Sequence, residues 1–142
     1  MPTSVVDLIM NFSLTLLPDH LAICQLPADS PFPPWAWGEN LFALVRNTDE
    51  LSVVCDDANV PEDIRAKRGW RALKVEGPLD FSLVGVLADF AGILADAGVS
   101  IFAISTFDTD YLLVRIDDVN QAVDALQKAG HVIQEYNIID HK

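Results

Sequence analysis

The sequence predicts an α+β fold in which the C-terminal half follows the order β-α-β-β-α-β. Two segments carry apolar side chains at helical spacing: Leu83, Leu87, Phe90 and Leu94, and then Val119, Ala122, Val123 and Leu126. Short runs rich in branched residues flank these segments, and a glycine follows each helix. Because strand-helix-strand connections are right-handed, this order predicts a four-stranded antiparallel sheet with two helices on one face, the ferredoxin-like fold.

The elements of this half are expected in a regular order from residue 70 onward. Asp80 or Ser82 can cap the first helix, which Gly98 ends, and Asp117 or Asp118 can cap the second. Gly130 closes the second helix. The expected strands cover 70–75, 99–104, 111–116 and 131–136, with the first helix over 82–97 and a turn over 106–110.

The N-terminal half predicts strands and little helix. Residues 12–26 indicate two strands around the turn dipeptide Pro18-Asp19, and residues 41–55 indicate a hairpin. Between them, residues 27–40 hold four prolines and two tryptophans, which favours an ordered loop. The loop over 56–63 is expected to start a short helix near Pro61, with the basic residues of 65–68 at its far end.

The two hairpins resemble each other in sequence. Residues 42–54 align without gaps on 102–114, an offset of 60 (102 − 42), and residues 22–26 similarly match 72–76. We therefore expect two related modules, a reduced one over 1–65 and a complete one over 66–142. In the first, the proline-rich loop replaces the helix over 82–97.

The charge balance restricts the classes of partner. Lys and Arg total 9 against 21 Asp and Glu, a net charge of −12. Such a chain repels phosphate backbones, so nucleic acids and anionic membranes are not expected partners. There is no apolar stretch of membrane-spanning length, and the N-terminal segment lacks the basic residues of a secretory signal. A cytoplasmic location is expected.

The residues that commonly carry catalysis show no pattern here. His20, His131 and His141 have no pairing spacing, and Ser82 lies outside a nucleophile-elbow motif. Cys24 and Cys55 sit in apolar runs without clustered histidines, which favours buried, reduced thiols over a zinc site. The sequence therefore predicts a protein that is not an enzyme and has no cofactor or metal.

Two segments have the chemistry to bind a small zwitterion. The loop 77–85 offers backbone amides at a helix N-terminus, where an amino acid's carboxylate can bind. Asp108 and Asp110, in the turn between two strands, can receive an ammonium or guanidinium group. The alternatives are an ordinary strand-helix turn and a solvated hairpin turn.

Two strings identify a family resemblance: Glu76-Gly77-Pro78-Leu79-Asp80-Phe81-Ser82-Leu83-Val84-Gly85-Val86-Leu87 and Ile101-Phe102-Ala103-Ile104-Ser105-Thr106-Phe107-Asp108-Thr109-Asp110-Tyr111. They resemble ACT domains, and more narrowly the small bacterial proteins of the CASTOR-type ACT family, as do residues 49–55 and 69–73. The resemblance covers residues 12–136. It implies regulatory amino-acid binding, side-by-side pairing with ligands at the seam, a homodimer, and a regulated enzyme as a further partner.

The resemblance and the residues together predict a sensor that binds a neutral or basic amino acid, or a related metabolite, without catalysis. The ligand-binding residues expected are Gly77, Pro78, Leu79, Asp80, Phe81, Ser82, Gly85, Ile104, Phe107, Asp108, Thr109 and Asp110. Two alternatives stay open: a ligand-free interaction or oligomerisation module, and an enzyme whose catalytic pair only the fold brings together.

Overall fold

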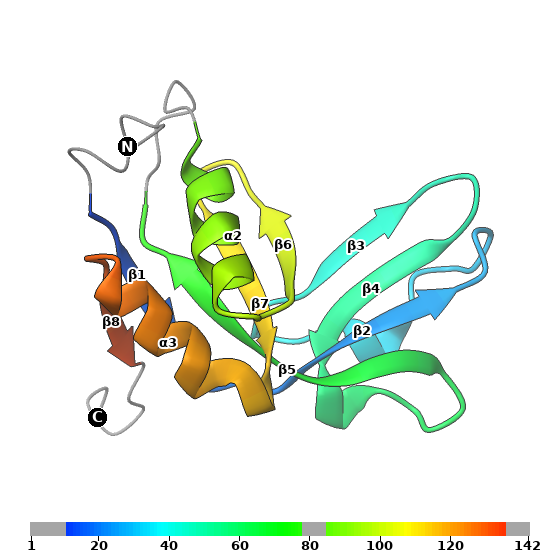
Figure 1. The fold of residues 1–142 in the computed structure, drawn as a ribbon. Helices are drawn as coiled ribbons and strands as arrows, with labels where there is room; N and C mark the ends of the chain where they lie inside the picture. Colours follow the sequence, from blue (N-terminus) through cyan, green and yellow to red (C-terminus); the bar gives the residue numbers. More distant parts are fainter. Residues whose placement is uncertain (1–10, 78–84, 136–142) are drawn as a thin grey trace. The chain divides into compact units, whose positions relative to one another are not determined.

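The computed structural model describes residues 11–77 and 85–135 and divides into two compact units (Figure 1). The N-terminal unit comprises Asp19–Trp70, and the C-terminal unit combines Met1–Pro18 with Arg71–Lys142. Strand β5 (Arg65–Val75) gives its first half to one unit and its second half to the other. Where the sequence suggested a boundary between residues 65 and 66, the units divide after residue 70, and the segment before residue 19 groups with the C-terminal unit.

The N-terminal unit is an antiparallel sheet. Its strands are β2 (Leu21–Leu26), β3 (Ala43–Arg46), β4 (Leu51–Asp56) and the first half of β5, in the order β3-β4-β2-β5. The predicted hairpin is therefore confirmed as β3 and β4. The buried core of this unit consists of Ala22, Cys24, Ala36, Leu51, Val53, Cys55 and Val60.

The proline-rich segment is an ordered loop, as predicted. It contains the single 3₁₀ turn η1 (Pro34–Ala36), which buries Ala36 against the core. Three aromatic rings pack on one another beside it: the Trp37 and Phe42 centroids are 5.0 Å apart, and Phe32 lies 6.0 Å from Trp37.

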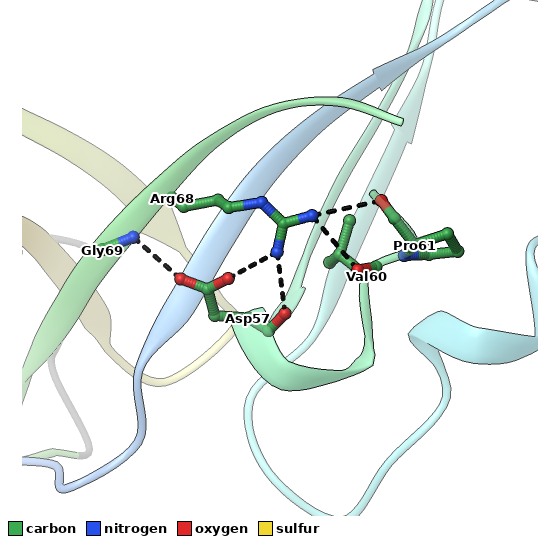
Figure 2. Close-up of polar contacts among 5 residues, drawn as sticks. All are labelled: Asp57, Val60, Pro61, Arg68 and Gly69. Atoms are coloured by element: carbon green, nitrogen blue, oxygen red, sulfur yellow. Dashed lines mark hydrogen bonds and ion pairs between the residues drawn. The ribbon is translucent and has the colours of Figure 1, made fainter. Parts of the chain in front are cut away.

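The prediction of a short helix near Pro61 is wrong. A 3₁₀ turn η2 (Asp57–Asn59) stands earlier, and β5 already begins at Arg65. Figure 2 shows the reason: the Arg68 guanidinium donates to the backbone carbonyls of Asp57, Val60 and Pro61, each at 3.1 Å. It also bonds the Asp57 carboxylate at 2.7 Å, and the second oxygen of that carboxylate accepts the Gly69 amide. Arg68 thus binds the segment between β4 and β5 through three of its backbone carbonyls and one carboxylate.

The C-terminal unit has five strands covered by two helices. The strands are β1 (Ser13–Leu16), the second half of β5, β6 (Ile101–Ser105), β7 (Asp110–Arg115) and β8 (Val132–Glu135), in the order β8-β1-β5-β7-β6. The helices are α2 (Val86–Asp96) and α3 (Val119–Lys128), the latter preceded by the 3₁₀ turn η3 (Ile116–Asp118). Both helices lie on one face (Figure 1). The ferredoxin-like α+β fold is confirmed.

Strand β1 changes the predicted sheet in one respect. It lies between β5 and β8, antiparallel to the first and parallel to the second. The expectation of a purely antiparallel, four-stranded sheet is therefore wrong. Nor do β1 and β2 form a hairpin around Pro18-Asp19, because each pairs with a different part of β5.

The helix phases are those that the apolar spacing predicts. Phe90 and Leu94 are buried, Leu87 is half-buried against the same core, and Leu83 lies outside the described residues. The sheet face beneath the helices carries six buried side chains: Leu14, Leu16, Leu73, Val75, Leu112 and Val114. Asp118 occupies the N-cap of α3 without a side-chain capping bond. Among the described residues, no helix is both long and apolar enough to cross a membrane.

The hairpins β3-β4 and β6-β7 match in structure, but one residue away from the ungapped alignment. Asn47 donates its amide to the Glu50 carbonyl in the first turn, and Thr106 donates to Thr109 in the second, an offset of 59 (106 − 47). At this offset, β4 and β7 coincide over their whole lengths, and the same three consecutive positions of each are buried. The strand-turn-strand resemblance is confirmed, but the offset of 60 is wrong. Because side chains alternate between the two faces of a strand, a shift of one residue would align the buried positions of one strand with positions on the other face.

Candidate functional site

The end of β5 and the turn between β6 and β7 are joined by a buried hydrogen bond. The hydroxyl of Thr109, a side chain with 8% of its surface exposed, donates to the backbone carbonyl of Val75. Strands β5 and β7 are neighbours in the sheet, as the order of a β-α-β-β-α-β unit requires. The turn 106–110 and the point where the chain leaves β5 at Gly77 therefore lie at the same end of the sheet.

The turn itself is held by hydrogen bonds between two threonines. The Thr106 amide donates to the Thr109 carbonyl at 2.8 Å, and the Thr109 amide donates to the Thr106 hydroxyl at 3.2 Å. The Asp110 carboxylate accepts the Ser105 hydroxyl at 2.6 Å. Phe107 and Asp108 form the exposed tip, with 82% of the Phe107 surface accessible. A large aromatic ring and a carboxylate are thus presented together to solvent.

Three more of the predicted site residues fall within the described chain. Gly77 is exposed at the end of β5, and Ile104 is half-buried in β6 opposite Tyr111. Gly85 stands at the N-cap of α2 with φ of 87°, a conformation that side chains adopt only under strain. Five further predicted residues lie outside the described residues: Pro78, Leu79, Asp80, Phe81 and Ser82.

The structure adds a residue that sequence reasoning did not single out. Asp89 lies in the first turn of α2, and its Oδ2 atom is buried but accepts no hydrogen bond from the described residues. A buried carboxylate oxygen without a donor is unfavourable, and a bound cationic group would relieve that cost. Acidic residues are common in the first turn of a helix, because their negative charge interacts favourably with the positive end of the helix dipole. The sequence alone therefore offers no reason to single out Asp89.

Cys24 and Cys55 are free and buried, as predicted. Cys24 pairs with Val53 and Cys55 with Ala22 across strands β2 and β4, so the thiols are diagonal neighbours on one face. A hydrogen bond to Cys24, and then burial, raise the pKa of the Cys55 thiol far above its ordinary value. Within residues 11–77 and 85–135, no group of three or more His, Cys, Asp and Glu side chains could hold a metal ion.

Two family models match separate parts of the chain. Residues 65–128 match the family model of the ACT domain, and residues 19–63 match a model described as the N-terminal domain of a protein family. Residues 65–128 of the chain form an ACT domain. A protein of Agobacterium tumefaciens with a crystal structure is 35% identical to this ACT protein, with a TM-score of 0.85 over 89% of this chain and 95% of its own.

Curated relatives share a shorter region. The rat cytosolic arginine sensor for mTORC1 subunit 1 is 42% identical over 60 residues, 42% of this chain and 18% of the sensor. The ACT protein thus spans less than a fifth of the length of that relative. The solved aspartokinase alpha and beta subunits share the fold, with a TM-score of 0.58 and 16% identity over 82% of this chain and 96% of theirs.

Proposed function

We propose that this ACT protein is a regulatory sensor that binds a neutral or basic amino acid without catalysing a reaction. The observation that carries the proposal is the buried bond between Thr109 and Val75. It holds the aromatic and acidic tip of the turn 106–110 at the sheet end from which the loop 77–85 leaves β5. The likeness to an arginine sensor supports an amino acid as the ligand class and L-arginine as the first probe.

Each charge of the ligand has a proposed partner. The carboxylate of the amino acid binds the backbone amides of the loop 77–85 and the positive dipole end of α2. The ammonium, or a guanidinium side chain, binds Asp89 and the acidic turn at Asp108 and Asp110. Separate partners are needed because each charge is costly to remove from water alone. The net charge of −12 favours ligands without excess negative charge.

A thermal-shift screen against the twenty amino acids tests the proposal. A ligand present at about one hundred times its Kd stabilises the native state by about 2.7 kcal/mol, a readily measured rise in melting temperature. We expect L-arginine or a neutral amino acid to raise the midpoint and L-glutamate and L-aspartate to have no effect. No shift with any of the twenty would leave the protein without a sensor function.

The second candidate is an oligomerisation module, which the exposed apolar residues of the N-terminal unit favour. Phe32, Trp37 and Val45 expose 40%, 69% and 61% of their surfaces. Val45 lies on β3, which pairs only with β4 among the described strands and so presents an open edge. We propose a homodimer, and light scattering that gives 15.6 kDa at micromolar concentration would contradict it.

The N-terminal unit is proposed as a reduced ACT-like module. In both units the second strand of a hairpin also pairs with the strand that comes before the hairpin in the chain. The sheet order is therefore β3-β4-β2 in one unit and β6-β7-β5 in the other. The loop with η1 stands where the C-terminal unit has α2. By analogy with the cytosolic relative, we propose a cytoplasmic location and a regulated enzyme as partner.

A further inference from the structure

The C-terminal unit contains a hollow that none of the predicted binding residues lines. Its volume is about 320 Å³, at the lower end of small-molecule sites. It lies between α3, the end of β1 and the strands on either side of β1. Arg71, on its wall, is four residues before Val75, so at about 3.3 Å per residue the hollow is about 13 Å along β5 from the bond to Thr109.

Arg71 is fixed in orientation. Its Nε and Nη2 atoms both donate to the backbone carbonyl of Leu17, at 3.0 and 2.8 Å. The other N–H groups of this guanidinium bond no described residue. A planar guanidinium held in this way is preorganised to bind a carboxylate through its remaining donors.

Glu135 faces the same hollow from the opposite side. Leu16 pairs with Leu73 on β5 and with Glu135 on β8, and Arg71 is two residues before Leu73, so all these side chains share one face of the sheet. Two strand spacings, about 10 Å, separate Leu73 from Glu135, and Arg71 lies two residues further along β5, so the backbones of Arg71 and Glu135 are about 12 Å apart. Glu135 has no ion-pair partner among the described residues.

The remaining lining selects against other ligand classes. Asp124, the second acid of the hollow, is already paired with Lys128 at 2.9 Å. Within residues 11–77 and 85–135, the Arg71 guanidinium and the Glu135 carboxylate of the hollow have no ion-pair partner, and one cation opposite one carboxylate suits neither a dianion nor a dication. Leu16, Val119, Val123 and Ile133 supply apolar surface between them.

We propose that this hollow is a separate binding site for an amino acid with an apolar side chain. Arg71 binds the α-carboxylate, Glu135 binds the α-ammonium, and the apolar side chain lies against Val123 and Ile133. The site does not depend on the sensor site proposed above, because the two share no residue.

Titration of the ¹⁵N-labelled full chain with L-leucine tests the proposal. We expect saturable shifts of the backbone amides of α3 and β8. Two isosteric probes that each lack one charge, 4-methylpentanoate and 3-methylbutylamine, should bind at least tenfold more weakly. An absence of saturable shifts, or shifts confined to the turn 106–110, would overturn the proposal.

Matched variants separate this site from the other. Glu135→Gln removes one ligand contact, and Val123→Phe fills the hollow while leaving every charge in place. Each should weaken L-leucine binding at least tenfold, whereas Glu62→Gln, an exposed acid of the N-terminal unit, should not change it. Asp89→Asn should leave the L-leucine affinity that is measured from the amide shifts of α3 and β8 unchanged, because Asp89 does not line the hollow. Wild-type affinity in both Glu135→Gln and Val123→Phe would overturn the assignment.

Discussion

The hydroxyl of Thr109 donates a buried hydrogen bond to the carbonyl of Val75, a residue 34 positions earlier in the chain. This bond ties the turn between β6 and β7 to the end of β5. Because the loop proposed to bind a carboxylate starts two residues after Val75, the bond fixes the acidic turn at the same end of the sheet. The proposed site therefore depends on a contact between two segments that the sequence separates.

Thr109→Val removes this bond with almost no change in side-chain shape. The Val75 carbonyl then loses a buried partner, so we expect the free energy of unfolding to fall by about 1–2 kcal/mol. Urea denaturation followed by circular dichroism measures the change. Thr48→Val, at an exposed position in the equivalent turn of the first hairpin, should stay within about 0.5 kcal/mol of wild type. Equal stability in both variants would show that the bond contributes little.

Arg68→Ala should release the segment that follows β4. The guanidinium binds three backbone carbonyls and the Asp57 carboxylate, and we expect its loss to cost about 1–3 kcal/mol. Lys67→Ala, at the exposed neighbouring residue, is the control and should be nearly neutral. Urea denaturation of both variants compares them, and a loss in Arg68→Ala no greater than the control's would contradict this role for Arg68.

Two glycines of the first helix should respond to alanine in opposite directions. Gly92 lies inside α2, and a Cβ there would meet nothing within 4 Å, so Gly92→Ala should stabilise the protein by about 0.5–1 kcal/mol. Gly98 follows the helix with φ of 77°, so Gly98→Ala should destabilise it by about 1–2 kcal/mol. Melting temperatures that shift in the same direction would contradict the backbone conformation of Gly98.

The buried Cys55 thiol should make stability fall at alkaline pH. The hydrogen bond to Cys24 and burial raise the pKa of Cys55 in the folded state, so its stabilising effect is complete below the unfolded thiol pKa of about 8.5. Above that pH the unfolded chain ionises first, so the contribution of Cys55 falls by about 2 kcal/mol at pH 10, and the hydrogen bond with Cys55, which lowers the pKa of Cys24, offsets part of this loss. Urea denaturation at pH 8 and pH 10 should show this loss in wild type, and Cys55→Ala should lose correspondingly less. The same loss in both proteins would contradict a raised pKa for Cys55.

The sequence predicted the elements that local patterns determine. The helical spacing of Phe90 and Leu94, the turn over 106–110 and the hairpin over 41–55 all have local causes, and the structure confirms them. The position of β1 between β5 and β8 was not predictable, because the sequence of a four-residue strand does not indicate which strands it pairs with. The hydrogen bonds that Arg68 donates to Asp57, Val60 and Pro61 are side-chain contacts across a loop, which the spacing of apolar residues does not predict.

Only those parts of the candidate site that follow from the order of the elements could be predicted from the sequence. The acidic turn could be placed at the sheet end where the chain leaves β5 at Gly77, because strand order in this fold follows from element order. Asp89 was missed, since its burial depends on packing rather than on its position in the helix. Arg71 was missed because the residues that face it, Leu16 and Glu135, are brought together by the pairing of β1 with two strands.

Isothermal titration calorimetry with L-arginine on the wild-type protein and on Asp89→Asn tests whether an amino acid binds where α2 begins. We expect saturable binding to wild type and an affinity at least tenfold lower in Asp89→Asn, because a charged hydrogen bond contributes about 1.5–3 kcal/mol. Asp96→Asn, which changes an exposed acid on the same helix, should bind as wild type does. Equal affinity in wild type and Asp89→Asn, or no binding of L-arginine to any of the three, would contradict an amino-acid site for L-arginine at this end of the sheet.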